Sequence, residues 1–198
     1  MRILAIETTD RVASVALLTR DGVYERIIDS GLRHAQTLMT AVDELLKQSG
    51  TCLEQVDAFA VDVGPGSFTG VRIGVTTANA LAFANGKKVV AVSSTEALAR
   101  PFIGEERCCA AIIDAKNGNC YAALYRGGDC LTEANAFVTE DFLKGLPSCC
   151  ILTGSGAADG AMPTAKNVAL CACGREGADE VVPLYLRPSQ AERLWKER

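Results

Sequence analysis

Short apolar runs separated by polar turn residues fill the first thirty positions, and the apolar residues that follow have a helical spacing. Short apolar and β-branched runs separated by turn residues predict three strands, at 2–8, 12–19 and 23–29. Apolar residues next recur every three or four positions from Ala35 to Leu46, with polar residues between them. This spacing predicts an amphipathic helix of about four turns that ends near Gly50.

The pattern that follows alternates between strands and helices. A buried strand is expected at 56–63, a loop at 64–70 and a second helix at 71–85, which Gly86 ends. A further strand at 88–92 and a short helix at 94–99 complete this half. Such alternation is typical of an α/β fold with mixed sheets.

The second half of the chain repeats the start of the first. Placing 5–11 over 112–118 aligns Glu7 with Asp114, 107 positions later, and the turn residue Asp10 with Asn117. Ala16 and Leu17 then fall over Ala123 and Leu124 at the same offset. This repeat predicts an internal duplication with two related lobes, at 1–104 and 105–198, of which the second is shortened.

The end of the second lobe has a weaker pattern. Residues 158–182 are rich in alanine and glycine and poor in large apolar side chains, so we expect them to bury little surface.

The amino-acid composition excludes several classes of protein. The 198 residues are 48% hydrophobic and 22% charged, which excludes a disordered or fibrous chain. The net charge of −4 disfavours a dedicated nucleic-acid binder, because phosphate contacts need a basic surface. We see no targeting segment and no stretch that could span a bilayer, so a cytoplasmic location is expected.

Residues that could hold a metal are scarce. The chain has nine cysteines and a single histidine, His34, and it contains no Cys-x-x-Cys pair. No metal site is predicted, and the cysteines are expected to act as reduced, small apolar side chains. One histidine also excludes a zinc peptidase, and no serine elbow supports a Ser-His-Asp triad.

Two acids, Glu7 and Asp114, end related strands and therefore suggest a cleft between the lobes. In a nucleotide-cleaving enzyme, one could hold hydrated Mg²⁺ and the other could orient water. The alternative is that each carboxylate accepts backbone N–H bonds within its own hairpin. The turn between the first two strands contains hydroxyls but no glycine, which argues against a phosphate clamp there.

The loop 64–70, Gly-Pro-Gly-Ser-Phe-Thr-Gly, links a buried strand to a helix start. It fits neither the P-loop nor the Gly-x-Gly-x-x-Gly pattern. It could bind an anion at the helix N-terminus, or it could be a tight turn capped by Ser67 or Thr69.

The helix that follows this loop is apolar on nearly every side, and Arg72 is its one charge. Its small residues recur every four positions, at Gly70, Gly74, Ala78 and Ala82. Either the helix is internal, or these small residues receive a partner helix at close approach.

Three segments resemble the bacterial TsaB family, older name YeaZ, of tRNA threonylcarbamoyladenosine biosynthesis proteins. They are Ile-Leu-Ala-Ile-Glu-Thr-Thr at 3–9, Gly-Pro-Gly-Ser-Phe-Thr-Gly-Val-Arg-Ile-Gly at 64–74 and Asp-Ala-Lys-Asn-Gly-Asn-Cys-Tyr at 114–121. The resemblance covers about residues 1–125. It implies the duplicated, RNase H-like fold of actin, sugar kinases and the Hsp70 ATPase.

The resemblance also implies a role without catalysis. Such a protein would be a scaffold that forms a heterodimer with a TsaD-like catalytic subunit, forms homodimers alone, and works with a TsaE-like ATPase. ATP and a divalent metal would bind the partners, and tRNA would be reached only through the complex. The alternative is an actin-like ATPase that uses Glu7 and Asp114.

The family pattern then implies which residues serve each role. The dimer interface would comprise Ala35, Leu38, Met39, Val42, Leu46, Arg72, Ile73, Gly74, Thr77, Ala78, Leu81 and Phe83. A degenerate nucleotide cleft would comprise Glu7, Thr8, Thr9, Asp114, Gly154 and Gly156.

Overall fold

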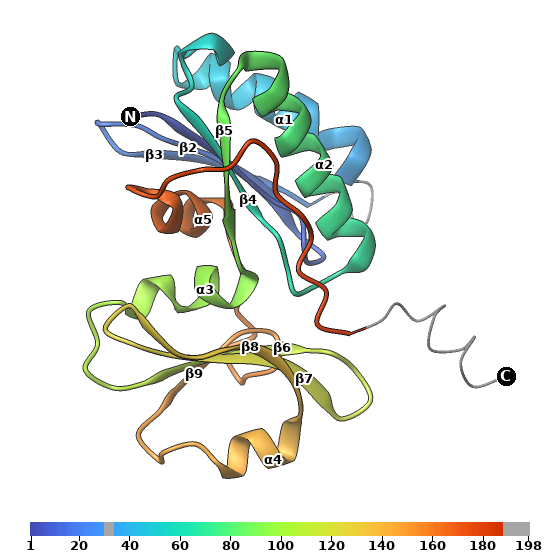
Figure 1. Cartoon of the computed structure of the whole chain (residues 1–198), viewed down its shortest axis with the longest axis vertical. Coiled ribbons are helices and arrows are strands. Elements are labelled where there is room, and N and C mark those ends of the chain that lie inside the picture. The colour runs from blue at the N-terminus through green and yellow to red at the C-terminus, as the bar shows by residue number, and fades with distance from the viewer. Residues whose placement is uncertain (30–33, 188–198) are drawn as a thin grey trace, which may run out of the picture.

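The computed structural model describes residues 1–29 and 34–187, except for the side chains of 34 and 35. Two sheets lie one above the other, joined through the short helix α3 (Figure 1). The first sheet has the order β3-β2-β1-β4-β5, with strands Ile3–Glu7, Ala13–Leu18, Val23–Ile28, Ala58–Asp62 and Lys88–Val92 numbered along the chain. The second has the order β8-β7-β6-β9, with strands Cys109–Asp114, Asn119–Arg126, Asp129–Val138 and Ile151–Thr153.

Three helices of the first half, α1 His34–Gln48, α2 Phe68–Asn85 and α3 Ser94–Ala99, occupy the positions that the sequence predicts. The structure also has α4 Thr139–Lys144, α5 Ala165–Ala172 and two short 3₁₀ turns, η1 Leu53–Gln55 and η2 Arg100–Phe102. Helices α1 and α2 cover one face of the first sheet, and α5 covers the other (Figure 1). Among the described residues, no helix has the length and hydrophobicity of a membrane span.

The strand pairing confirms the internal duplication. In both sheets the first strand pairs antiparallel with the second and parallel with a later one, β4 or β9. Glu7 and Asp114 end the matching strands, as the overlay predicts. Ala5 pairs with Ala16, however, whereas Ile112 pairs with Ala122, so the overlay of Ala16 on Ala123 was wrong. The second hairpin is one residue shorter.

The expectation that residues 158–182 bury little was wrong. In α5, the side chains of Ala165, Val168, Ala169 and Ala172 are fully buried against β1, β2 and β4. Small side chains let this helix lie close to the sheet, so a segment with little apolar bulk still closes a face of the core.

Residues 177–187, which we call the C-terminal strap, return along the first sheet toward the second (Figure 1). Ala178 bridges the edge strand β5 at Val89, and the N–H of Leu184 donates to the carbonyl of Val63 at 2.7 Å. Arg187 then donates to Asn119 Oδ1 at 2.8 Å, on β7. The division into lobes at residue 104 stays a prediction. Helix α5 and the strap belong to the second half of the sequence, yet they pack on the first sheet.

The small residues of α2 face the protein's own sheet. Gly70, Gly74, Ala78 and Ala82 are all buried within the chain. A Cβ atom at Gly70 would overlap the carbonyl oxygen of Thr8, and one at Gly74 would overlap its hydroxyl. The hypothesis that these residues receive a partner helix was therefore wrong, because β1 already occupies that space.

We predict that Gly70→Ala destabilises the fold. Alanine gains about 1 kcal/mol of helix propensity, but its methyl group has no space beside Thr8 and displaces backbone, so the free energy of unfolding should fall by about 2 kcal/mol net. Urea denaturation measures this change. Gly104→Ala is the control, because nothing lies within 4 Å of a Cβ there. Equal stability of the two variants would contradict the close packing.

Candidate functional site

A cleft of about 590 Å³ lies between the two sheets. Its walls come from the turn after β1, the start of α2, the turn between β6 and β7, and the C-terminal strap. Arg11, Lys116 and Arg187 bring positive charge to this cleft, while Asp10 and Asp114 bring negative charge. Phe68 and Tyr185 stack on one wall, with their ring centroids 4.9 Å apart. The volume suits a small-molecule ligand.

Two of the six residues predicted for this cleft line it, namely Thr9 and Asp114. Thr8 instead donates from its hydroxyl to the carbonyl of Gly70 at 2.7 Å, beneath α2. Gly154 and Gly156 lie against Ile112, where a side chain would overlap β6. Thr8 and the two glycines therefore position the walls of the cleft and do not face it.

Glu7 is fully buried and does not line the cleft. Its Oε1 accepts hydrogen bonds from the N–H and the hydroxyl of Thr9, at 2.5 and 2.7 Å. Burial, and then the nearby Asp62, raise the pKa of Glu7 well above its usual value. Its Oε2 has no hydrogen-bond partner among the described residues, which also favours the protonated, uncharged form.

Asp114 occupies the same place in the second sheet, but its carboxylate is partly exposed. It accepts from the N–H of Lys116 at 2.8 Å and pairs with the Lys116 ammonium at 2.6 Å, and these bonds lower its pKa. Both acids therefore accept N–H bonds within their own hairpins, which confirms that alternative. In this arrangement Glu7 does not offer a carboxylate to the cleft.

Sequence reasoning missed Asp62, the partner of Glu7 in a buried acid pair. It ends β4, which lies parallel to β1, so the two acids meet at one edge of the sheet. Asp62 accepts from the hydroxyl of Ser94 at 2.6 Å and from the N–H of Gly64 at 2.8 Å. Burial nevertheless raises its pKa to about 7. An acid at the end of an apolar strand, next to the strand of Glu7, was the available signal.

The loop 64–70 is a capped turn. The hydroxyl of Ser67 accepts from the N–H of Gly70 at 3.3 Å, so Ser67 is the N-cap of α2, as one alternative predicts. The N–H of Ser67 donates to the carbonyl of Thr9 at 2.7 Å. The segments 3–9 and 64–74, two of the three that carry the family resemblance, are thus hydrogen-bonded to each other.

The outward side of α1 and α2 is the second candidate surface. Phe83 is 88% exposed and Met39 is 49% exposed, although both are large and apolar. Leu46, Ile73, Thr77 and Leu81, on the same two helices, are half-buried. We call these six residues the exposed helix face. A groove of about 510 Å³, lined by Met39, Leu46 and Leu53 among others, adjoins it.

Several residues predicted for the interface lie elsewhere. Leu38, Val42, Gly74 and Ala78 are buried in the core, because they face the sheet. The Arg72 side chain donates to the Tyr185 hydroxyl at 2.8 Å and lies 4.0 Å from the centre of the Phe68 ring, so it fastens the strap. The side chain of Ala35 lies outside the described residues.

Comparison with known proteins places the chain in a family. It is 31% identical to the tRNA threonylcarbamoyladenosine biosynthesis protein TsaB of Bacillus subtilis, over an alignment of 226 positions that covers 100% of this chain and 99% of that protein. The chain belongs to the TsaB family. A family model for TsaD, tRNA N6-adenosine threonylcarbamoyltransferase, also matches residues 28–144. The identification from the three sequence segments is confirmed.

Other relatives support the same family assignment. TsaB of Escherichia coli is 39% identical over 129 residues, which cover 64% of this chain and 55% of that protein. A solved structure of YeaZ from Pseudomonas aeruginosa has a TM-score of 0.78 at 28% identity, covering 93% of this chain and 99% of that one. A second, described as similar to peptidase YEAZ from the same organism, has a TM-score of 0.81 at 28% identity, with 94% and 99% covered. The predicted α/β fold, with mixed sheets flanked by helices, is confirmed.

The described side chains form no group of three or more His, Cys, Asp or Glu residues that could hold a metal ion.

The acid pair predicts a pH dependence of stability. The pKa of Asp62 is about 7 in the folded chain and about 4 when unfolded, so the native state binds more protons between these values. The free energy of unfolding should therefore fall as pH rises from 4 to 7, by up to about 4 kcal/mol from this group. In the Asp62→Asn variant, the free energy of unfolding should fall less steeply with pH. Urea denaturation at several pH values measures this slope.

Glu54→Gln is the control, because Glu54 is an exposed acid on η1. It should keep the slope of the wild-type chain. An Asp62→Asn variant with that same slope would show that Asp62 ionises normally in the folded state.

Proposed function

We propose that this chain is a non-catalytic scaffold subunit of the assembly that adds a threonylcarbamoyl group to the adenosine beside the anticodon of tRNA. It binds a TsaD-like catalytic subunit through the exposed helix face. Membership of the TsaB family supports the pathway, and the exposed apolar residues on α1 and α2 support the mode of action. The exposure of Phe83 is the observation that carries the proposal.

The physical argument concerns the cost of leaving this face in water. Large aromatic and aliphatic side chains in a contiguous exposed group mark interaction sites, and aromatic residues commonly dominate the binding energy. Phe83 makes little contact with its own chain, so the fold gains little from it. A partner that covers Phe83, Leu81 and Met39 would remove this apolar surface from water.

The matching family model supports the choice of partner. Residues 28–144 of this chain fit the TsaD family, so the two proteins share the region that contains α1 and α2. A related pair of helices on the partner could pack against these two, and two copies of this chain could pair in the same way. We therefore expect a homodimer in isolation and a heterodimer when the partner is present.

The remaining chemistry is assigned to other subunits. A TsaE-like ATPase joins the assembly, ATP and a divalent metal bind the partners, and tRNA is contacted through the complex in the cytoplasm. The buried, proton-holding Glu7 supports this assignment, because a carboxyl away from the cleft surface cannot position magnesium there.

Phe83→Glu should weaken the heterodimer while leaving the fold intact. A charge at the centre of an apolar interface is costly to desolvate, so we expect a 30-fold or greater rise in Kd, corresponding to about 2 kcal/mol or more. Titration calorimetry with the TsaD-like subunit measures this. The free energy of unfolding of the variant should change by less than about 0.5 kcal/mol.

Leu131→Glu is the matched control, because Leu131 is a 49% exposed apolar residue on β8, in the other sheet. It should bind the partner as the wild type does. Unchanged affinity of Phe83→Glu would refute the assignment of this face. Ala78→Glu is unsuitable, since Ala78 lies in the core.

Reconstituted tRNA modification tests the scaffold role. Omitting this chain from a mixture of the TsaD-like and TsaE-like subunits, ATP, the threonylcarbamoyl donor and tRNA should lower the rate at least tenfold. This chain alone should neither modify tRNA nor hydrolyse ATP. Magnesium-dependent ATP binding at micromolar concentration, lost in Asp114→Ala, would instead establish the ATPase alternative.

A further inference from the structure

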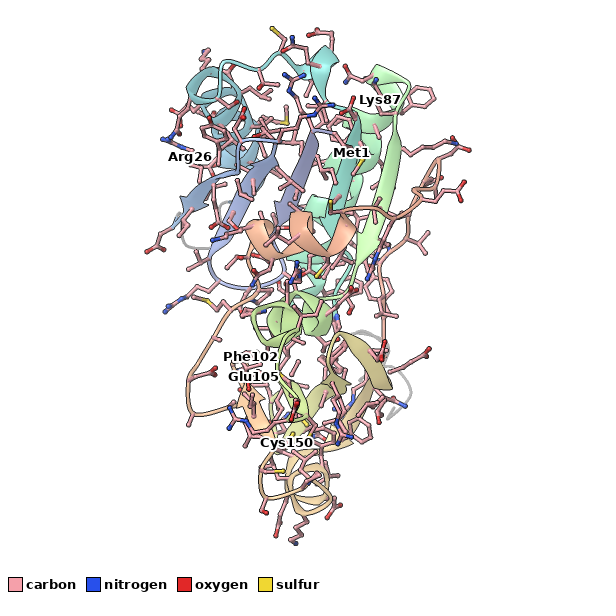
Figure 2. All side chains as sticks on the ribbon, turned by 90° about the vertical axis from the view of Figure 1, so that its left-hand side faces the viewer. Met1, Arg26, Lys87, Phe102, Glu105 and Cys150 are labelled. Carbon is pink, nitrogen blue, oxygen red and sulfur yellow. The ribbon has the colours of Figure 1, made fainter. Side chains whose placement is uncertain are left out.

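A second cavity, of about 340 Å³, shares no residue with the cleft described above. Four segments line it, namely α3 with η2, Cys109 on β6, the end of β7 with the turn after it, and the end of α5 with the residues after it. Figure 2 shows α5 in front of the first sheet and above α3, with Phe102 below α3. The cavity thus lies where elements of both sheets meet, and it has the size of a small-molecule site.

Part of the lining is apolar. Phe102 and Ile103 come from η2 and the residue after it, and Leu170 comes from α5. The thiols of Cys109 and Cys171 also line the cavity, and burial raises their pKa values to about 11 and about 12. These thiols are therefore uncharged near neutral pH and add to the apolar surface.

The rest of the lining is strongly basic. Arg100, Arg126 and Arg175 all line the cavity, and Glu96 is the one acid among the lining residues. Arg175 forms a two-pronged ion pair with Glu96. In the described part of the chain, the side chains of Arg100 and Arg126 form no hydrogen bond or ion pair, although Arg100 is half-buried. Two positive charges beside an apolar wall are left without a counter-charge.

We propose that this cavity binds a small organic oxyanion with an apolar body, whose carboxylate or phosphate group is held by Arg100 and Arg126. The planar guanidinium forms paired hydrogen bonds with both kinds of oxyanion. The apolar body lies against Phe102, Ile103 and Leu170. Since the walls come from both sheets, the bound anion also links the two halves of the molecule.

Three probes of one shape test the site: naphthoate, naphthyl phosphate and the neutral naphthamide. The anions should shift the amide NMR signals of residues around the cavity, and naphthamide should bind at least tenfold more weakly. The anion that binds with the higher affinity shows whether the site prefers a carboxylate or a phosphate. Equal binding of all three probes, or no binding, would overturn the proposal.

Two arginine variants locate the anion. Arg126→Gln and Arg100→Gln should each weaken binding at least tenfold. Arg126 is exposed, so its replacement preserves the fold and gives a clear result even where Arg100→Gln is less stable. Arg20→Gln is the control, at the exposed turn between β2 and β3. Unchanged binding by Arg126→Gln would overturn the role of the arginines.

Cysteine labelling gives an independent readout. Cys173 is exposed and lines the cavity, whereas Cys149 is exposed and lies outside it. The stronger anion should slow alkylation of Cys173 by iodoacetamide and leave Cys149 unchanged, as peptide mass spectrometry can measure. Equal rates at Cys173 with and without the anion would place binding elsewhere. None of these measurements involves the exposed helix face, so the scaffold proposal is tested separately.

Discussion

The contact between the start of α2 and the end of β1 determines most of this structure. Two hydrogen bonds of 2.7 Å join the segments, from Ser67 to Thr9 and from Thr8 to Gly70. They require glycine at the points of closest approach, because a side chain would occupy the position of the Thr8 or Thr9 backbone. This contact seats the start of α2 against the sheet, and it fixes which side of α2 faces outward.

The duplicated fold gives the same position two different environments. Glu7 and Asp114 end corresponding strands, yet Glu7 is fully buried beside Asp62, and Asp114 meets water and a lysine. Among the described residues, the second sheet has no counterpart of α2, because β9 is followed by a turn that contains Gly154 and Gly156. The protein thus repeats one arrangement of strands in two sheets, with one of the two matching acids in the core and the other at the surface.

The sequence was sufficient for the elements that depend on local pattern. The spacing of apolar residues located the strands, α1 and α2, and the repeat of strand, acid and turn revealed the duplication. It could not show which side of α2 meets the sheet, because that helix is apolar almost all round. Nor could it show that α5 closes the core, since alanine-rich segments occur in loops as well as in close-packed helices.

Contacts between distant segments were also beyond local reasoning. Asp62 gains its significance only when β4 lies beside β1, and Arg100 and Arg175 meet only after α5 has crossed to the first sheet. For the same reason, four of the residues predicted for the interface, Leu38, Val42, Gly74 and Ala78, face the sheet. Helical spacing identifies residues that share one side of a helix, and tertiary packing determines whether that side faces the core or the solvent.

The C-terminal strap has a mechanical consequence. The polypeptide passes from the first sheet to the second through α3, returns with α5, and then reaches β7 again through Arg187 and Asn119. The C-terminal strap is therefore a further connection between the two sheets, and a large rotation of one sheet against the other would have to break the bond between Arg187 and Asn119.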